Sequence, residues 1–273
     1  MISGDKILTD TATTVALEDL TSGWEKRRLW LTLARDDIRV RYKRTVLGQL
    51  WITMGFGFFV AAIGMLWSEI MHRDIVVFVP WFAIGITTWH FITAAINEGT
   101  TTFIGASSTI HNIPLPLSLH IFRAITRHFL NYLHNFIIVI VALVLFPSPA
   151  SAAMLLYLPG MFIIILAATA TNIVLGILGA RYRDLSHGVR MLMMPMFFIT
   201  PILWVPDMLS GSRAWLAQLN PFTHFIAIVR EPLLGRVPEL LNYAVSLSLT
   251  LCFVLLALRL LGNYRWKVPY WIS

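Results

Sequence analysis

The sequence has 273 residues, of which 57% are hydrophobic and only 13% are charged, and its mean hydropathy is +0.72. Soluble domains carry about 25% charged residues, so this composition excludes an ordinary soluble protein and predicts a membrane protein. The net charge of +7 does not indicate nucleic-acid binding, because the basic residues lie between long uncharged runs, as membrane topology requires. A single cysteine, Cys252, excludes an internal disulfide and a cysteine metal cluster, and we expect no metal site.

The N-terminal segment is polar over residues 1–23 and lacks the apolar core of a signal peptide, so we expect a tail without a cleaved leader. Ser22 and Glu25 have capping-box spacing, which predicts an amphipathic interface helix over residues 24–44 that begins near Trp24. This helix is expected along the inner leaflet, either as a topological anchor alone or also in contact with a cytoplasmic partner. Its basic face carries Arg28, Arg35, Arg39 and Lys43, and its apolar face carries Trp24, Leu31, Ile38 and Tyr42.

Six uncharged intervals predict the membrane spans, since a helix needs about 20 mostly apolar residues to cross the hydrocarbon core. The uncharged run from 128 to 180 is too long for one helix, and Pro147 and Pro149 predict a tight turn that divides it into a hairpin. The fifth interval is shorter and contains Pro195 and Pro201. The predicted spans are 45–68, 75–97, 128–146, 152–180, 191–206 and 240–258. The expected fold is an all-α membrane protein with six transmembrane helices in a single transmembrane domain over residues 45–273.

Two other uncharged intervals are not predicted to cross. Residues 99–122 contain many hydroxyl, amide and proline side chains, which are costly in lipid, so we expect a cytoplasmic loop with short helices. Residues 214–229 are expected to dip into the membrane from outside as a re-entrant segment between helices five and six, with a covered extracellular loop as the alternative. Both termini are then cytoplasmic, with 17 basic residues inside and four outside, in agreement with the positive-inside rule.

Several short motifs, in this order, resemble the ABC-2 type permeases that export polysaccharides such as O-antigen, capsule and teichoic acid. The resemblance covers nearly the whole chain from residue 24. It implies a homodimer in the bacterial inner membrane, bound by two copies of a separate ATPase, that moves a lipid-linked polysaccharide outward. The motifs are Asp37-Ile38-Arg39-Val40-Arg41-Tyr42, Leu47-Gly48-Gln49-Leu50-Trp51, Asn112-Ile113-Pro114-Leu115-Pro116, Arg181-Tyr182-Arg183-Asp184, Thr200-Pro201-Ile202-Leu203, Leu219-Asn220-Pro221-Phe222 and Ile228-Val229-Arg230.

The sequence contains no G-x-x-x-x-G-K-[ST] phosphate-binding loop, so ATP and Mg²⁺ are expected in the partner ATPase and no cofactor in this chain. Energy for transport must then enter through cytoplasmic loops. The resemblance implies that the Asn-Ile-Pro-Leu-Pro loop contacts the ATPase, with an ordinary irregular loop as the alternative. A second coupling element is expected between helices four and five, where a purely topogenic charged loop is equally consistent. The candidate coupling residues are Ser108, Ile110, Asn112, Pro114, Arg181, Arg183 and Asp184.

Polar side chains at helical spacing line one face of a helix that enters the membrane from the cytoplasm: His120, Arg123, Arg127, Asn131 and His134. Ionisable groups in a membrane helix face protein or water, so this stripe is expected on an interior surface. Paired arginines suit the diphosphate of a lipid-linked glycan, and we expect Arg123 and Arg127, beside His120, at its entrance. Packing against a partner subunit, or pairing with Glu98, is the alternative.

Two of the predicted spans are rich in aromatic residues, which suits a glycan channel because sugars stack their C–H faces on rings. Aromatic side chains also populate interface belts and lipid-facing surfaces, so that interpretation stays open. The candidate channel-lining residues are Trp51, Phe56, Phe59, Trp67, Phe197, Phe198 and Trp204. The main alternatives to a glycan exporter are an ABC-2 exporter of small drugs or lipids and an intramembrane glycosyl- or acyltransferase. The transferase is disfavoured because no paired carboxylates lie near a span.

Overall fold

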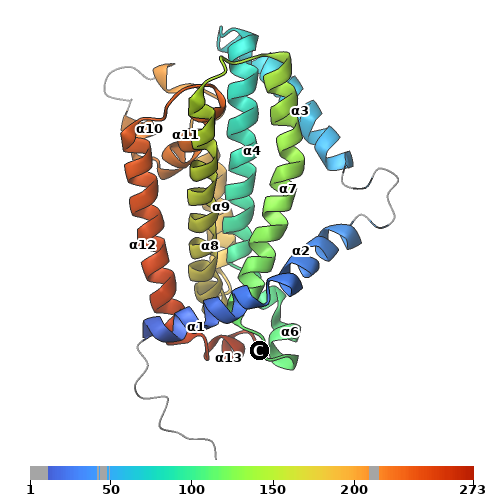
Figure 1. Cartoon of the computed structure of the whole chain (residues 1–273), viewed down its shortest axis with the longest axis vertical. Helices are drawn as coiled ribbons and strands as arrows, with labels where there is room; N and C mark the ends of the chain where they lie inside the picture. Colours follow the sequence, from blue (N-terminus) through green and yellow to red (C-terminus); the bar gives the residue numbers. More distant parts are fainter. Residues whose placement is uncertain (1–11, 42, 44–47, 49, 209–214) are drawn as a thin grey trace, which may run out of the picture.

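The computed structural model describes residues 12–41, 43, 48, 50–208 and 215–273, which form helices joined by short connections (Figure 1). Within these residues no strand occurs, and the predicted all-α class is confirmed. In chain order the elements are α1 (Ala12–Glu25), α2 (Arg27–Arg41), α3 (Leu50–Ile70), α4 (Ile75–Gly99), α5 (Thr102–Gly105), α6 (Ser107–Asn112), α7 (Leu117–Leu145), η1 (Ala152–Leu156), α8 (Tyr157–Arg181), α9 (Leu185–Ile199), η2 (Pro206–Met208), α10 (Trp215–Leu219), α11 (Pro221–Leu233), α12 (Leu240–Tyr264) and α13 (Val268–Trp271).

Five stretches of the described chain are long and apolar enough to cross a membrane: α3, α4, α7, η1 with α8, and α12. They lie side by side as a bundle, with α1, α2, α6 and α13 at one end and α10 and α11 toward the other (Figure 1). We call these the α1 end and the α10 end. All five correspond to predicted spans, although α3 begins at Leu50 rather than at 45.

The sixth predicted span, 191–206, corresponds to α9, which has only 15 residues and ends at Ile199. Thr200 has an extended backbone, because the residue before a proline is disfavoured in the helical conformation and Pro201 follows it. The chain then continues through turns to η2. That α9 and its continuation form a sixth crossing, and that α10 and α11 form a re-entrant segment, both stay predictions.

The N-terminal helices correct the predicted helix start. Helical structure begins at Ala12, so the expected start near Trp24 is wrong, and Ser22 lies near the end of α1 instead of capping a helix. The reason is tertiary packing: α1 lies across the α1 end and buries Ala16, Asp19 and Gly23, in contact with α7 and α12. A short break at Lys26 separates it from α2.

α2 packs on α7 through Trp30 and Ala34, which are buried, and leaves Arg28, Arg35 and Arg39 exposed as the basic face requires. Of the predicted apolar face, Leu31 and Ile38 are half-buried while Trp24 is exposed. Tyr42 and Arg44 lie outside the described residues.

The loop predicted over residues 99–122 contains the expected short helices α5 and α6, but its last part is wrong because α7 begins at Leu117. Asp19 of α1 explains the early start. Its carboxylate accepts hydrogen bonds from the backbone N–H groups of Leu117 and Ser118, which leaves the first turn of α7 capped by another helix.

α4 is the central helix of the bundle and contacts α3, α7, α8, α9 and α11. Small residues permit the closest approach, where α8 passes the end of α4. A Cβ atom on Gly179 would clash with the backbone carbonyl of Thr100, and one on Gly176 would press on the ring of Phe103. Small residues at helix interfaces are the usual means of close packing in membranes, where burial in protein gains little over burial in lipid.

Candidate functional site

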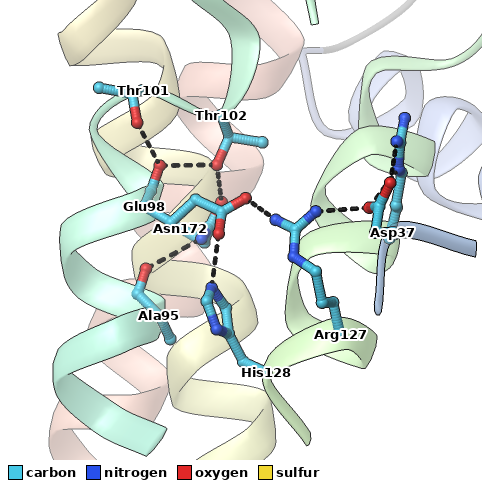
Figure 2. A network of polar contacts seen from close by, with 9 residues as sticks. Asp37, Ala95, Glu98, Thr101, Thr102, Arg127, His128 and Asn172 are labelled. Atoms are coloured by element: carbon cyan, nitrogen blue, oxygen red, sulfur yellow. Dashed lines mark hydrogen bonds and ion pairs between the residues drawn. The ribbon is translucent and has the colours of Figure 1, made fainter. Parts of the chain in front are cut away.

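A network of ion pairs joins α2, α7 and α4 at the α1 end (Figure 2). Arg123 Nε donates to Asp37 Oδ2 at 2.9 Å, and Arg127 lies between Asp37 and Glu98 and donates to both. His128 Nε2 lies 2.7 Å from Glu98 Oε2. These side chains are between 12% and 29% exposed, so water screens their charges only in part.

The network depends on helix geometry. Arg123 and Arg127 are four residues apart, so both project from the same face of α7 toward α2, and His128 adds a group that faces α4. Asp37 is the one acidic group of α2 that bridges the two arginines in the described structure. The ion pairs therefore fix α2, which is not a membrane span, to two helices that are.

The two arginines lower the pKa of the Asp37 carboxylate. Partial burial by itself raises its pKa, but hydrogen bonds from Arg123 and Arg127 and their positive charges outweigh that effect and hold the pKa below its ordinary value. Asp37 is therefore ionised at neutral pH, and the charge pairing is complete there.

A second set of hydrogen bonds extends from Glu98 to α8 (Figure 2). The hydroxyl of Thr102 donates to the backbone carbonyl of Glu98 at 2.9 Å and lies 2.9 Å from Asn172 Oδ1. Asn172 is fully buried, and its amide donates to the carbonyl of Ala95 at 3.0 Å. Polar contacts thus run from α2 through α7 and α4 to α8.

A cavity of about 460 Å³ adjoins the network and brings together the residues predicted for a diphosphate entrance. Its lining includes His120, Arg123 and Arg127, together with Glu98 and with Arg190 of α9. His120 is 3% exposed, and neither of its ring nitrogens has a hydrogen-bond partner. The alternative pairing of Arg127 with Glu98 is present as well, so both arginines already have carboxylate partners in this structure.

The remaining polar residues of the stripe lie farther along α7. Asn131 lines a second cavity of about 340 Å³, which is bounded by α3, α4 and α7 and which His90 and Asn135 also line. His134 hydrogen-bonds the carbonyl of Leu130 in its own helix. The predicted stripe is therefore divided between two cavities and a local contact.

The two predicted coupling elements meet at the α1 end through the last residues of the chain. His111 of α6 lies 3.1 Å from the carbonyl of Pro269, and Arg183 donates to the carbonyl of Ser273 at 3.0 Å. The guanidinium of Arg181 lies 5.3 Å from the ring of Trp271. α6, the 181–184 turn and α13 thus form one surface.

Most of the predicted coupling side chains are accessible on that surface. Ser108, Asn112, Pro114, Arg181, Arg183 and Asp184 are exposed, while Ile110 is half-buried. The Asn112 amide donates to the carbonyl of Ser108 at 2.7 Å, which holds its side chain against α6.

The predicted channel aromatics are not brought onto one surface of this chain. Phe56 is buried beside His90, and Phe59 packs on Phe82 of α4. Phe197 contacts Trp89 from the α9 side. The others differ in exposure: Trp51 and Phe198 are exposed, whereas Trp67 and Trp204 are half-buried.

A buried arginine holds the chain at the α10 end. Arg230 of α11 is 1% exposed, donates from Nη1 to the carbonyl of Pro201 at 2.7 Å, and stacks with its guanidinium carbon 3.3 Å from the ring centroid of Trp81. Asn220, which caps α11, donates to the hydroxyl of Thr200. These contacts give the Pro201 carbonyl and the Thr200 hydroxyl hydrogen-bond partners just after α9 ends.

Sequence reasoning missed the role of several of these residues. Asp37 and Arg230 were noticed only as parts of motifs, and Asp19 and Asn172 were not singled out at all. A signal was available for Asn172, since a lone amide in a long uncharged run implies a buried partner. No local pattern pairs Asp19 with the start of α7, which lies 98 residues away along the chain.

The chain is similar in sequence to known membrane transport proteins. The chain is 24% identical over 216 residues to an O-antigen export system permease protein RfbA of Klebsiella pneumoniae, which covers 79% of this chain and 82% of the relative. A protein of the same name from Myxococcus xanthus is 20% identical over 222 residues, covering 79% of this chain and 84% of the relative. The family model for ABC-2 type transporters matches residues 28–234, and the chain therefore belongs to that family.

Proposed function

We propose that this chain is the membrane permease subunit of an ABC exporter that moves a lipid-linked polysaccharide, O-antigen or capsule-like, across the bacterial inner membrane. The observation that carries the proposal is the family match over residues 28–234, joined to relatives that are O-antigen export permeases and that align over most of their length. A multi-span bundle with no ATP-binding motif of its own is the expected form of such a subunit.

The energy source is proposed to be a separate ATPase that docks at the α1 end, which is then cytoplasmic with both chain termini. The surface formed by α6, the 181–184 turn and α13 supports this proposal, because hydrogen bonds and a cation–π contact hold the two predicted coupling elements together there. The ion pairs of Asp37 with Arg123 and Arg127 offer a route by which α2 passes movement to α7 and α4.

The transported lipid is proposed to place its diphosphate in the cavity beside Arg123, Arg127 and His120. Arg190 supports the proposal, because it lines the same cavity and has no carboxylate partner among the described ion pairs. Arginine forks match the geometry of phosphate oxygens. Substitution of both Arg123 and Arg127 by glutamine should abolish export while the subunit still assembles. Intact export would refute this role.

A homodimer is proposed on the basis of α3, whose outward face carries large apolar side chains such as Met54, Phe58 and Met65. A second copy of the chain covers such a face as well as lipid does. Cysteine crosslinking across α3 in membranes checks this: a crosslink at Phe58→Cys supports the interface, and a monomer at all α3 positions contradicts it.

Deletion of the gene is the decisive experiment for the function as a whole. Cells without the chain should lack surface polysaccharide and should accumulate lipid-linked polymer on the cytoplasmic side. The wild-type chain should restore surface polysaccharide in these cells. It should not do so when the partner ATPase lacks catalytic activity, and this pair of results would support the exporter. Normal surface polysaccharide with altered drug or phospholipid efflux would instead indicate an exporter of small molecules.

A further inference from the structure

A cavity at the α10 end has a different character from the two cavities near α7. It has a volume of about 500 Å³ and lies between the start of α4, the chain after α9, α10, α11 and the start of α12. Small-molecule sites are typically about 300–1,000 Å³ in volume, so the space suits a small ligand. It belongs neither to the ion-pair network nor to the candidate aromatic residues.

Three buried polar atoms of its lining residues have no hydrogen-bond partner: Trp81 Nε1, Thr223 Oγ1 and Arg230 Nε. Trp81 is 7% exposed and Arg230 is 1% exposed, so water does not serve these groups freely. Arg230 already donates from Nη1 to the carbonyl of Pro201 and stacks the flat face of its guanidinium on Trp81. A buried donor left unpaired is destabilising, and a ligand with oxygen acceptors would satisfy these groups once the side chains turn toward the cavity.

Charges around the cavity are balanced, and this decides the class of ligand. Among the described lining residues there are three arginines and three carboxylates, and one of each forms an ion pair, with Arg236 Nε 2.7 Å from Glu231 Oε2. A site for an anion or a cation would carry an excess of the opposite charge. The charged lining residues are Arg73, Arg230, Arg236, Asp207, Glu231 and Glu239.

The same wall also presents apolar surface, because Val77, Val237 and Leu241 line the cavity and are exposed. A sugar ring has hydroxyl groups that donate to carboxylates and accept from N–H groups, and it has C–H faces that pack on apolar side chains. Balanced charge, spare donors and apolar patches together match a neutral polyhydroxylated ring better than a lipid or an ion.

We propose that this cavity binds a neutral saccharide unit of the transported glycan at the α10 end, with Trp81, Thr223 and Arg230 as hydrogen-bond donors. The proposal rests on the proposed function for the source of the sugar. Its chemistry concerns only this chain, so the purified protein suffices to test it.

The test measures saturation-transfer NMR between free sugars and the full chain in nanodiscs. Neutral hexoses and their disaccharides are the probes, and glucuronate and glucosamine are the charged comparators. Thr223→Val removes a hydroxyl group at nearly constant volume, and Trp81→Phe removes the indole N–H while it keeps an aromatic ring beside Arg230. The double variant should weaken hexose binding at least tenfold. Trp215→Phe is the matched control, because Trp215 is an exposed tryptophan of α10 outside the cavity lining, and its binding should equal wild type.

Equal hexose binding by the double variant and the wild type, or stronger binding of glucuronate or glucosamine than of hexoses, overturns the proposal. If the double variant fails to fold, Thr223→Val alone is measured against the same criterion at threefold. Export is scored separately in cells. A chain that binds hexoses through these residues but exports no glycan contradicts the proposed function alone, whereas normal export with unaffected hexose binding in the variant contradicts the cavity alone.

Discussion

α3 and α4 are adjacent helices with the same mean hydropathy of 1.8, yet 22% of the span of α3 is buried within the chain against 78% for α4. α3 packs on α4 and α7 only along one side and exposes a row of large apolar residues, whereas α4 is surrounded by helices. The difference shows that hydropathy identifies helices that can lie in lipid. Hydropathy does not identify which helices are surrounded by other helices, because a lipid tail is as apolar as a leucine side chain.

Packing shape and polar contacts distinguish the two helices instead. Thr87 and Thr88 of α4 donate hydrogen bonds from their hydroxyl groups to carbonyls of their own helix, and Glu98, one residue before the end of α4, belongs to the ion-pair network. α3 contributes no residue to the ion pairs of the described chain. Substitutions should therefore lower the stability of the fold much more on α4 than on α3.

The largest contrast is expected between Phe82→Ala on α4 and Phe58→Ala on α3. Phe82 is fully buried and Phe58 is 76% exposed. Phe82→Ala removes the buried ring and leaves a cavity, and such a substitution should lower the free energy of unfolding by about 3–5 kcal/mol. Phe58→Ala should change it by less than about 0.5 kcal/mol. Reversible unfolding in mixed micelles measures both, and equal losses would break the comparison.

A somewhat smaller effect is expected from adding one methyl group where α8 passes α4. Gly179→Ala places a Cβ atom against the backbone carbonyl of Thr100, and such overpacking costs about 1–3 kcal/mol. Gly55→Ala on α3 meets no atom within 4 Å and should leave stability unchanged or slightly raised. The melting temperatures of the two variants test this prediction. An unchanged melting temperature for Gly179→Ala would mean that the α4–α8 contact is looser than described.

The network at the end of α4 should couple two helices by a measurable but modest amount. A double-mutant cycle of Asp37→Asn and Arg127→Gln is expected to give a coupling energy of about 1 kcal/mol, since contacting charges typically couple by about 0.5–3 kcal/mol. The control pairs Asp37→Asn with Arg35→Gln, because Arg35 is exposed and absent from the described ion pairs. Coupling in the control but not in the test pair would contradict the network.

The smallest effect concerns pH. The pKa of Asp37 is lowered in the folded chain, so the stability that its charge contributes is complete above its unfolded pKa and is lost as pH falls through the folded value. That window lies in the acid range, below about pH 4. The difference in melting temperature between wild type and Asp37→Asn should therefore be constant from pH 8 to pH 5. A steady decline over that range would show that Asp37 is not held by the arginines.

The sequence was a good guide to features that depend on long runs or on local spacing. Uncharged intervals located the five long helices, and the four-residue spacing of Arg123 and Arg127 put them on one face. The loop predicted over residues 99–122 was expected to contain short helices, and α5 and α6 lie there. These features follow from helix period and from the cost of charge in lipid.

Features set by distant contacts were not predictable in the same way. The start of α1 depends on packing of Ala16 and Gly23 against α7 and α12, so the capping-box signal at Ser22 was misleading. The early start of α7 depends on Asp19 from another helix. The cavity at the α10 end is lined by five separate parts of the chain, and no spacing rule brings these together.

The short α9 has a consequence for the membrane around the protein. Fifteen residues of helix extend about 22 Å, less than the roughly 30 Å of a typical hydrocarbon core. Met191, Met194 and Phe198 face outward from it, so acyl chains or another subunit meet a hydrophobic belt of reduced height there. Where lipid covers this side, we expect headgroups to be drawn inward and the bilayer to be thinned beside α9. Bilayer thickness thereby becomes a variable to which this side of the protein responds.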